Sequence, residues 1–141
     1  MDLMDRIMEL SGYGYCCSQV LARLLLETMG EENEGFVKAM AGLNAGVGFS
    51  GGCCGCMTAG VCILSYVTGK GACDESEHPE HKSALGEFIQ WFTYEMTAEY
   101  GGCDCRDIVK GNPANRLRFC PQIMADTYAK CMELLTEREL I

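Results

Sequence analysis

Cysteine is the residue type whose number and spacing suggest chemistry in this chain. Eleven of the 141 residues are cysteine. Most of them fall in three short clusters, which are Cys16-Cys17, Cys53-Cys54-Gly55-Cys56 and Cys103-Asp104-Cys105. A domain of this length can bury a core without neighbouring thiols. Grouped thiols, by contrast, can ligate a metal, hold a cluster or exchange electrons. The clusters therefore predict a sulfur-based functional site.

The composition favours a reducing compartment, in which these thiols stay free. The longest apolar stretch, residues 61–67, is far shorter than the ~20 residues of a membrane span. The first residues mix charges with apolar side chains, unlike a secretory signal. We therefore expect a cytoplasmic protein without a membrane partner, whose cysteines are reduced. The net charge of −9 argues against a nucleic-acid partner, which needs a basic face.

The elements that must position the thiols are expected to be helices. Apolar residues recur every three or four positions in residues 3–10, 20–25, 36–41, 85–96 and 123–135. No segment alternates as a strand would. Residues 57–68 are apolar on all sides, as in a helix surrounded by others. We expect an all-α fold with a glycine- and cysteine-rich turn, in which a bundle of about six helices surrounds this central one. Residues 1–141 are expected to form a single domain.

The cysteine clusters coincide with expected helix starts. We expect a helix to begin at or directly after four sites, namely Cys17, the pair Cys54 and Cys56, Cys105, and Cys120. Cys120 is included because Pro121 follows it, and proline is favoured at the first helical position. Free amide groups and the helix dipole stabilise anions there, including a thiolate or an anionic metal–thiolate cluster. Cys62 and Cys131 are expected to pack in the core, and Cys73 to lie in a loop.

A glycine-rich segment, residues 42–60, separates two of these helices. Residues 46–51 satisfy the bare dinucleotide-binding pattern. However, no strand precedes it, no helix follows directly, and the lysine of a phosphate loop is missing. Because glycine tolerates positive φ, we expect this turn to donate backbone N–H groups to the sulfur site. The alternative is that the glycines only permit close helix packing.

Three familiar cysteine sites fit the sequence less well. Covalent c-type haem requires a histidine after the second cysteine, but Met57 follows Cys56. A thioredoxin-like Cys-x-x-Cys lies beside a βαβ pattern, which this chain lacks. Structural zinc usually shows two such pairs, and here there is one.

Residues 12–21, GYGYCCSQVL, and residues 54–60, CGCMTAG, resemble the redox-active C-GCAxxG-C-C proteins. These are small bacterial proteins that are related in part to the split-Soret cytochromes. Carried over to this chain, the four family cysteines are Cys17, Cys54, Cys105 and Cys120. If the signature is read from Gly55, its thiol is Cys56. The choice within each cysteine cluster therefore stays open.

Two mechanisms follow for the candidate residues Cys17, Cys54, Cys56, Cys105 and Cys120. In the favoured one they ligate an iron–sulfur cluster that carries electrons, because four convergent helix starts suit an anion with several ligands. In the alternative, cysteine pairs cycle between dithiol and disulfide without a metal. A third reading is a metal-binding sensor or interaction module without turnover. The resemblance implies a redox partner protein, which the sequence does not identify, and oligomer formation stays open.

Overall fold

A computed structural model describes residues 2–141; Met1, the first residue of the expected domain, lies outside it. The described chain forms α1 (Leu3–Gly12), α2 (Cys17–Met29), α3 (Glu34–Met40), the 3-10 turn η1 (Ala41–Leu43), α4 (Gly55–Thr68), α5 (His81–Tyr100), α6 (Cys105–Val109) and α7 (Ala114–Glu137). Residues 2–141 contain no strand, only an isolated antiparallel bridge between Cys53 and Asp104. The predicted all-α fold is confirmed, and residues 2–141 form seven α-helices, one central and six others.

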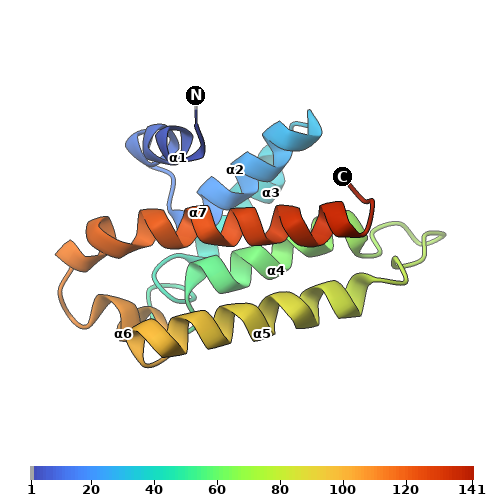
Figure 1. Cartoon of the computed structure of the whole chain (residues 1–141). Coiled ribbons are helices and arrows are strands. Elements are labelled where there is room, and N and C mark those ends of the chain that lie inside the picture. The colour runs from blue at the N-terminus through green and yellow to red at the C-terminus, as the bar shows by residue number, and fades with distance from the viewer. Residues whose placement is uncertain (1) are drawn as a thin grey trace.

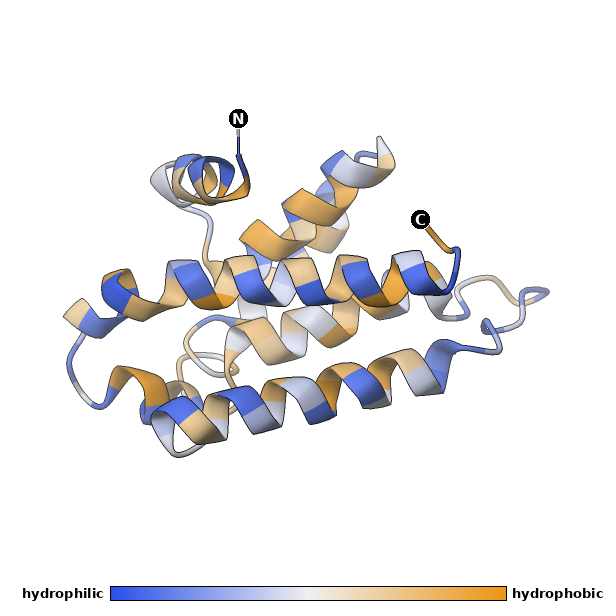
Figure 2. Ribbon diagram, viewed as in Figure 1, coloured by the Kyte–Doolittle hydropathy of each residue, from blue (hydrophilic) through white to orange (hydrophobic). Residues whose placement is uncertain are grey.

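The helix α4 lies at the centre of the molecule, packed against α2, α5 and α7 (Figure 1). It has no charged residue, and Ile63 and Leu64 are completely buried. The hydrophilic residues of α5 and α7 lie mainly on their outer sides (Figure 2). At Gly60 an added Cβ would lie 2.2 Å from Cζ of Phe88 in α5. The absence of a side chain at Gly60 therefore sets how closely α4 and α5 approach.

The start of α7 differs from the prediction. The helix begins at Ala114, directly after Pro113, and runs through Cys120 and Pro121 to Glu137. A proline inside a helix removes one backbone hydrogen bond to the residue four positions earlier. That residue is Leu117, which is 81% exposed, so water can reach its carbonyl group. Cys120 therefore lies inside a helix, and its predicted role as a cap is wrong.

The glycine-rich turn closes on itself by an unusual backbone path. The five consecutive residues 45–49 all have positive φ, between 53° and 75°. Val47 is among them, although a β-branched side chain disfavours this region. The amides of Gly48, Gly51 and Gly52 donate to carbonyl groups of residues 42–46, at 2.8–3.0 Å. These amides are occupied within the turn. The prediction that they bond to the sulfur site is therefore wrong for these three.

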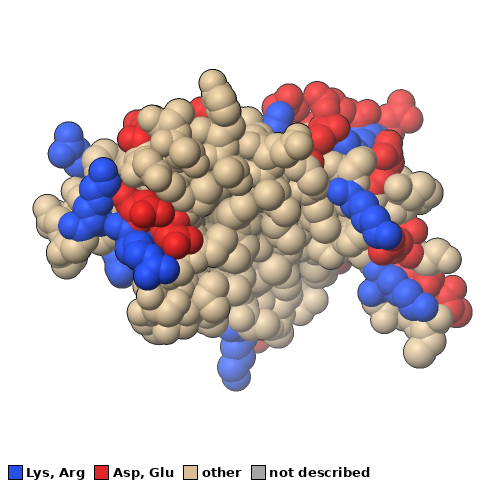
Figure 3. Space-filling view, turned by 90° about the horizontal axis from the view of Figure 1, so that it is seen from below, with Lys and Arg blue, Asp and Glu red and all other residues tan. Residues whose placement is uncertain are grey.

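The charged side chains are unevenly distributed. In a view from below Figure 1, they gather at the two ends and leave a wide uncharged area between them (Figure 3). Among the described helices, none is long and apolar enough to span a membrane.

Candidate functional site

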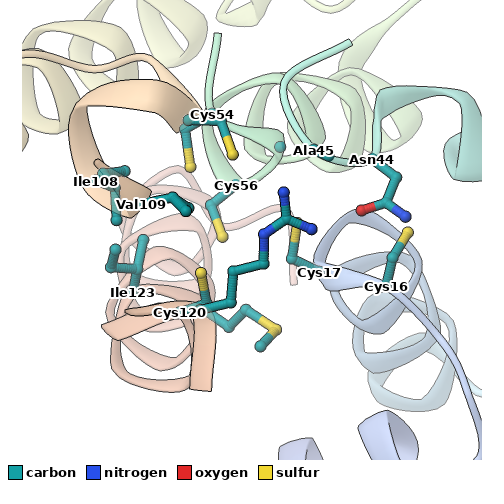
Figure 4. Close-up of a pocket in the computed structure, with 14 residues that line it drawn as sticks. Cys16, Cys17, Asn44, Ala45, Cys54, Cys56, Ile108, Val109, Cys120 and Ile123 are labelled. Carbon is teal, nitrogen blue, oxygen red and sulfur yellow. The ribbon is translucent and has the colours of Figure 1, made fainter. Parts of the chain in front are cut away.

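One cavity of about 170 Å³ brings the clustered cysteines together (Figure 4). It lies where α2 and α4 begin, beside α6 and the first half of α7. Six cysteines line it, which are Cys16, Cys17, Cys54, Cys56, Cys105 and Cys120. All five predicted site residues are in this set, with Cys16 as a sixth. Cys103, the alternative to Cys105, does not line the cavity.

The start of α2 positions Cys17. Cys16 is the residue before the helix, and its amide donates to Oε1 of Gln19 at 3.3 Å, which fixes how the chain enters the helix. Cys17 is then the first residue of α2, and the amides of Cys17 and Ser18 at the helix start lower the pKa of its thiol. The amides at a helix start have no partner within the helix. The predicted stabilisation of a thiolate by such amides therefore applies to Cys17.

The start of α4 positions Cys54 in the same way. Cys54 directly precedes the helix, and the amides of Cys56 and Met57 at the helix start lower the pKa of its thiol. The bridge between the segments ties this helix start to α6. The amide of Cys54 donates to the carbonyl of Cys103 at 3.0 Å, and that of Cys105 donates to Gly52 at 2.7 Å. Two cysteine clusters about fifty residues apart in the chain are thereby held side by side.

Cys56 lies between Cys54 and Cys17 (Figure 4). Hydrogen bonding with the Cys56 thiol is the largest cause that lowers the pKa of Cys17, ahead of the opposing effect of burial. The same thiol lowers the pKa of Cys54. These two hydrogen bonds, followed by burial, raise the pKa of Cys56 well above its usual range. Cys17 and Cys54 are thus the cysteines of lowered pKa in this group, and Cys56 is the one of raised pKa.

Cys105 and Cys120 line the same cavity but behave differently. Burial raises the pKa of Cys105, and it raises the pKa of Cys120 to about 12. The positive charge of Arg116 lowers both pKa values, by less than burial raises them. Cys120 has no free helix amides, since it lies inside α7. The predicted stabilisation of a thiolate at a helix start thus applies to Cys17 and Cys54 but is wrong for Cys105 and Cys120.

Gly55 is the point at which α4 touches the sulfur of Cys17. A Cβ at this position would lie 2.7 Å from Cys17 Sγ and 3.3 Å from the carbonyl oxygen of Leu43. The cavity therefore depends on glycine here for space. Counted from Gly55, the residues Gly-Cys-x-x-x-Gly end at Gly60, the position that accommodates Phe88. Both glycines of the signature have a steric role when it is read from Gly55.

The remaining cysteines lie outside the cavity. Cys131 is fully buried and donates to the carbonyl of Gly60 at 3.8 Å, in keeping with its predicted place in the core. Cys62 is half-buried in α4, and Cys73 is exposed in the loop after it. The Cys53 thiol contacts Met57, with 3.3 Å between Sγ and Sδ.

Gly55, in the glycine-rich turn that was expected to pass close to the sulfurs, also lines the cavity. Sequence reasoning missed the other residues that line it, which are Asn44, Ala45, Ile108, Val109, Arg116, Ile123 and Met124. Arg116 and Cys120 are four residues apart, a spacing that places both on one face of a helix. The mistaken start of α7 hid this signal. When the helix begins at Ala114, one continuous stripe on its surface contains Arg116, Cys120, Ile123 and Met124.

Cysteine sulfur is the usual ligand of an iron–sulfur cluster, so the donor chemistry is suitable. Across residues 2–141, however, no group of three or more Cys, His, Asp or Glu side chains is arranged to hold a metal ion. The six cysteines that line the cavity are the residues that would hold such a cluster.

A family model described as "Putative redox-active protein (C_GCAxxG_C_C)" matches residues 15–134. The chain belongs to this family. The family segment contains all the residues that line the cavity, and only α1 and the chain ends fall outside it. No curated protein and no solved structure matched the chain. The resemblance predicted from residues 12–21 and 54–60 is confirmed.

Proposed function

We propose that this protein is a thiol–disulfide redox protein, in which Cys17 and Cys56 cycle between dithiol and disulfide. The observation that supports this most directly is the single thiol of Cys56 between two cysteines of lowered pKa. A thiolate is the attacking species in thiol–disulfide exchange. This group of three supplies a nucleophile, a second thiol in contact with it, and a base for the second thiol.

Cys17 is the proposed nucleophile. It is partly exposed, whereas Cys54 and Cys56 are only 6% and 1% exposed. The Cys17 thiolate attacks one sulfur of a substrate disulfide RS–SR. The S–S bond breaks, a mixed disulfide forms between Cys17 and one RS group, and the other group leaves as RS⁻. This step removes the negative charge from Cys17, so Cys56 loses one of its two hydrogen-bond acceptors.

Cys54 then acts as the base in the second step. Its thiolate takes the proton from Cys56, and the resulting Cys56 thiolate attacks the Cys17 sulfur of the mixed disulfide. A bond forms between Cys17 and Cys56, and the second RS group leaves as RS⁻. In total two protein thiols are oxidised to one disulfide, and one substrate disulfide is reduced to two thiols. The proposed partner is therefore a molecule that carries a disulfide.

The test is reaction with bis(2-hydroxyethyl) disulfide at pH about 5.5, well below the ordinary thiol pKa of about 8.5. Only thiols of lowered pKa react readily there, which excludes exposed cysteines such as Cys73. We expect a Cys17–Cys56 disulfide in peptide mass maps of the wild type. We expect an accumulated mixed disulfide on Cys17 in Cys56→Ser, and a slowed second step in Cys54→Ser. A Cys17→Ser variant that still consumes the reagent at the wild-type rate contradicts the proposal, and Cys131→Ser serves as the control.

An iron–sulfur cluster is the second candidate function, because six cysteines line a cavity in which the dithiol scheme uses three. The two candidates differ in a direct measurement. After anaerobic incubation with iron and sulfide, the dithiol protein should show no new visible absorption. A visible band that Cys→Ser changes at Cys17, Cys56, Cys105 and Cys120 each abolish would favour the cluster.

A further inference from the structure

We propose that the thiol cavity accepts a small disulfide that carries a negative charge, and that Arg116 selects this charge. The inference rests on the proposed dithiol chemistry and adds the class of substrate. It would exclude neutral or cationic disulfides, and the disulfides of folded proteins, as the preferred reactants.

Arg116 is a cation at the mouth of the cavity without an acidic partner. Its side chain is exposed and lines the cavity beside the cysteines. Within residues 2–141, no Asp or Glu lies within ion-pairing distance of it, whereas Arg106 and Arg138 are paired with Asp104 and Glu87. A guanidinium group presents a planar set of donors that matches a carboxylate. The missing partner is proposed to be the anionic group of the substrate.

Because the rest of the protein is negatively charged, an anionic substrate needs a cation at the cavity to attract it. The chain carries a net charge of −9, which repels an approaching anion at long range. A thiolate at Cys17, the proposed nucleophile, adds to this repulsion. The field of Arg116 extends into the cavity, as its effect on the pKa of Cys105 and Cys120 shows. Among residues 2–141, Arg116 is the one basic residue that lines the cavity.

The size and the apolar walls of the cavity indicate how the substrate lies in it. About 170 Å³ is below the ~300 Å³ at which sites for drug-sized ligands begin. The space therefore takes only the end of a small molecule, and not a loop of a folded protein. Ile108, Val109, Ile123 and Met124 form apolar walls, which suit carbon and sulfur better than a charge. The disulfide lies inside against Cys17, and the carboxylate stays at the mouth with Arg116.

Three aliphatic disulfides of similar size, which differ in charge, test this proposal. They are the anionic 3,3′-dithiodipropionate, the neutral bis(2-hydroxyethyl) disulfide and the cationic cystamine. The rate of oxidation of Cys17 is measured by quenched mass spectrometry in the wild type and in Arg116→Gln. Loss of one unit charge at about 4 Å in water corresponds to about fivefold in rate. We expect Arg116→Gln to slow the anionic disulfide about fivefold, leave the neutral one unchanged and accelerate cystamine.

Two further variants separate charge from other effects. Arg116→Lys keeps the charge and should retain most of the preference for the anion. Arg118→Gln removes a neighbouring charge on α7 that stacks over Phe119 and does not line the cavity, so it should match the wild type. Equal changes in all three rates in Arg116→Gln would overturn the inference and leave the dithiol function intact. Failure of Cys17 to react with any of the three in the wild type would overturn both.

Discussion

The grouping of Cys17, Cys54 and Cys56 is the main feature of the site at the scale of residues. Hydrogen bonding with Cys17 and Cys54, followed by burial, raises the pKa of Cys56. Hydrogen bonding with Cys56 and the amides of the helix starts lower the pKa of Cys17 and Cys54. The pKa of each thiol thus follows from its immediate neighbours, and small changes of position should alter reactivity before they alter the fold.

Gly55→Ala is the substitution that tests this dependence. The new Cβ would lie 2.7 Å from Cys17 Sγ, so the short side chain of Cys17 must turn away. The hydrogen bond with Cys56 is then lost, and the pKa of Cys17 should rise towards that of an ordinary thiol. We expect a slower reaction with the neutral disulfide at pH about 5.5, well below that ordinary pKa, and a midpoint of the pH–rate curve shifted to higher pH.

The matched control for Gly55→Ala is Gly42→Ala. Gly42 has open space where its Cβ would lie, and its φ is not positive. This variant should react like the wild type. An unchanged pH–rate curve in Gly55→Ala would show that contact with Gly55 does not set the reactivity of Cys17.

At this scale the sequence identified the sulfurs but not their charge states. Cys17, Cys54, Cys56, Cys105 and Cys120 were recognisable from clustering and from expected helix starts. Burial raises the pKa of both Cys105 and Cys54, and Cys54 is the more deeply buried. The two differ because Cys54 has a hydrogen bond with the Cys56 thiol, which lowers its pKa. The burial of each thiol by distant segments has no signature in local spacing.

At the scale of elements, the close approach of α4 and α5 supports the cavity, because α4 begins at the site and is held in place along its length. The contact is made by the ring of Phe88 over Gly60. Gly60→Ala would place a methyl group within this contact. Overpacking of this kind costs about 1–3 kcal/mol, and we expect the free energy of unfolding, measured by urea denaturation, to fall by that amount.

Gly86→Ala on the partner helix α5 is the control, and we expect it to raise the free energy of unfolding instead of lowering it. Gly86 lies on the exposed side of α5, with open space for a Cβ. Replacing glycine by alanine inside a helix usually stabilises by about 0.5–1 kcal/mol. If Gly60→Ala is as stable as Gly86→Ala, the two helices are not held by this contact.

The central helix and the absence of a sheet followed from apolar spacing alone, since residues 57–68 have no polar face to expose. The start of α7 did not follow, because Pro121 is a strong local signal for a helix start. Contacts of α7 with α1, α4 and α6 along its length outweigh the one hydrogen bond that the proline removes. Tertiary packing thus decided an element boundary that local propensity placed seven residues later.

At the scale of the whole molecule, the thiols of raised pKa make the folded state sensitive to alkali. The folded protein keeps the proton of Cys120 up to a pKa of about 12, whereas an unfolded thiol loses it at about 8.5. Between these values the unfolded state binds fewer protons, so the free energy of unfolding falls as pH rises. Cys105 and Cys62 act in the same direction.

We therefore expect the urea midpoint of the reduced protein to decrease between pH about 8.5 and about 11. The cysteines of lowered pKa, Cys17 and Cys54, do not cancel this loss, because their stabilising effect is already complete above the unfolded pKa. The decrease should be shallower in Cys120→Ala, whatever its stability at pH 7. An equally steep decrease in that variant would mean that Cys120 does not carry the effect.

The connection between α4 and α5, residues 69–80, lies at the end of α4 opposite the cavity (Figure 1). A cut there would divide the protein into two fragments, each with part of the site. The first would hold Cys17, Cys54 and Cys56, and the second would hold Cys105 and Cys120. The packing of α4 against α5 and α7 would remain as the attraction between them. The molecule is thus suited to fragment complementation. Cysteines of the first fragment and cysteines of the second line one cavity only when the two fragments are associated, so their proximity would report reassembly.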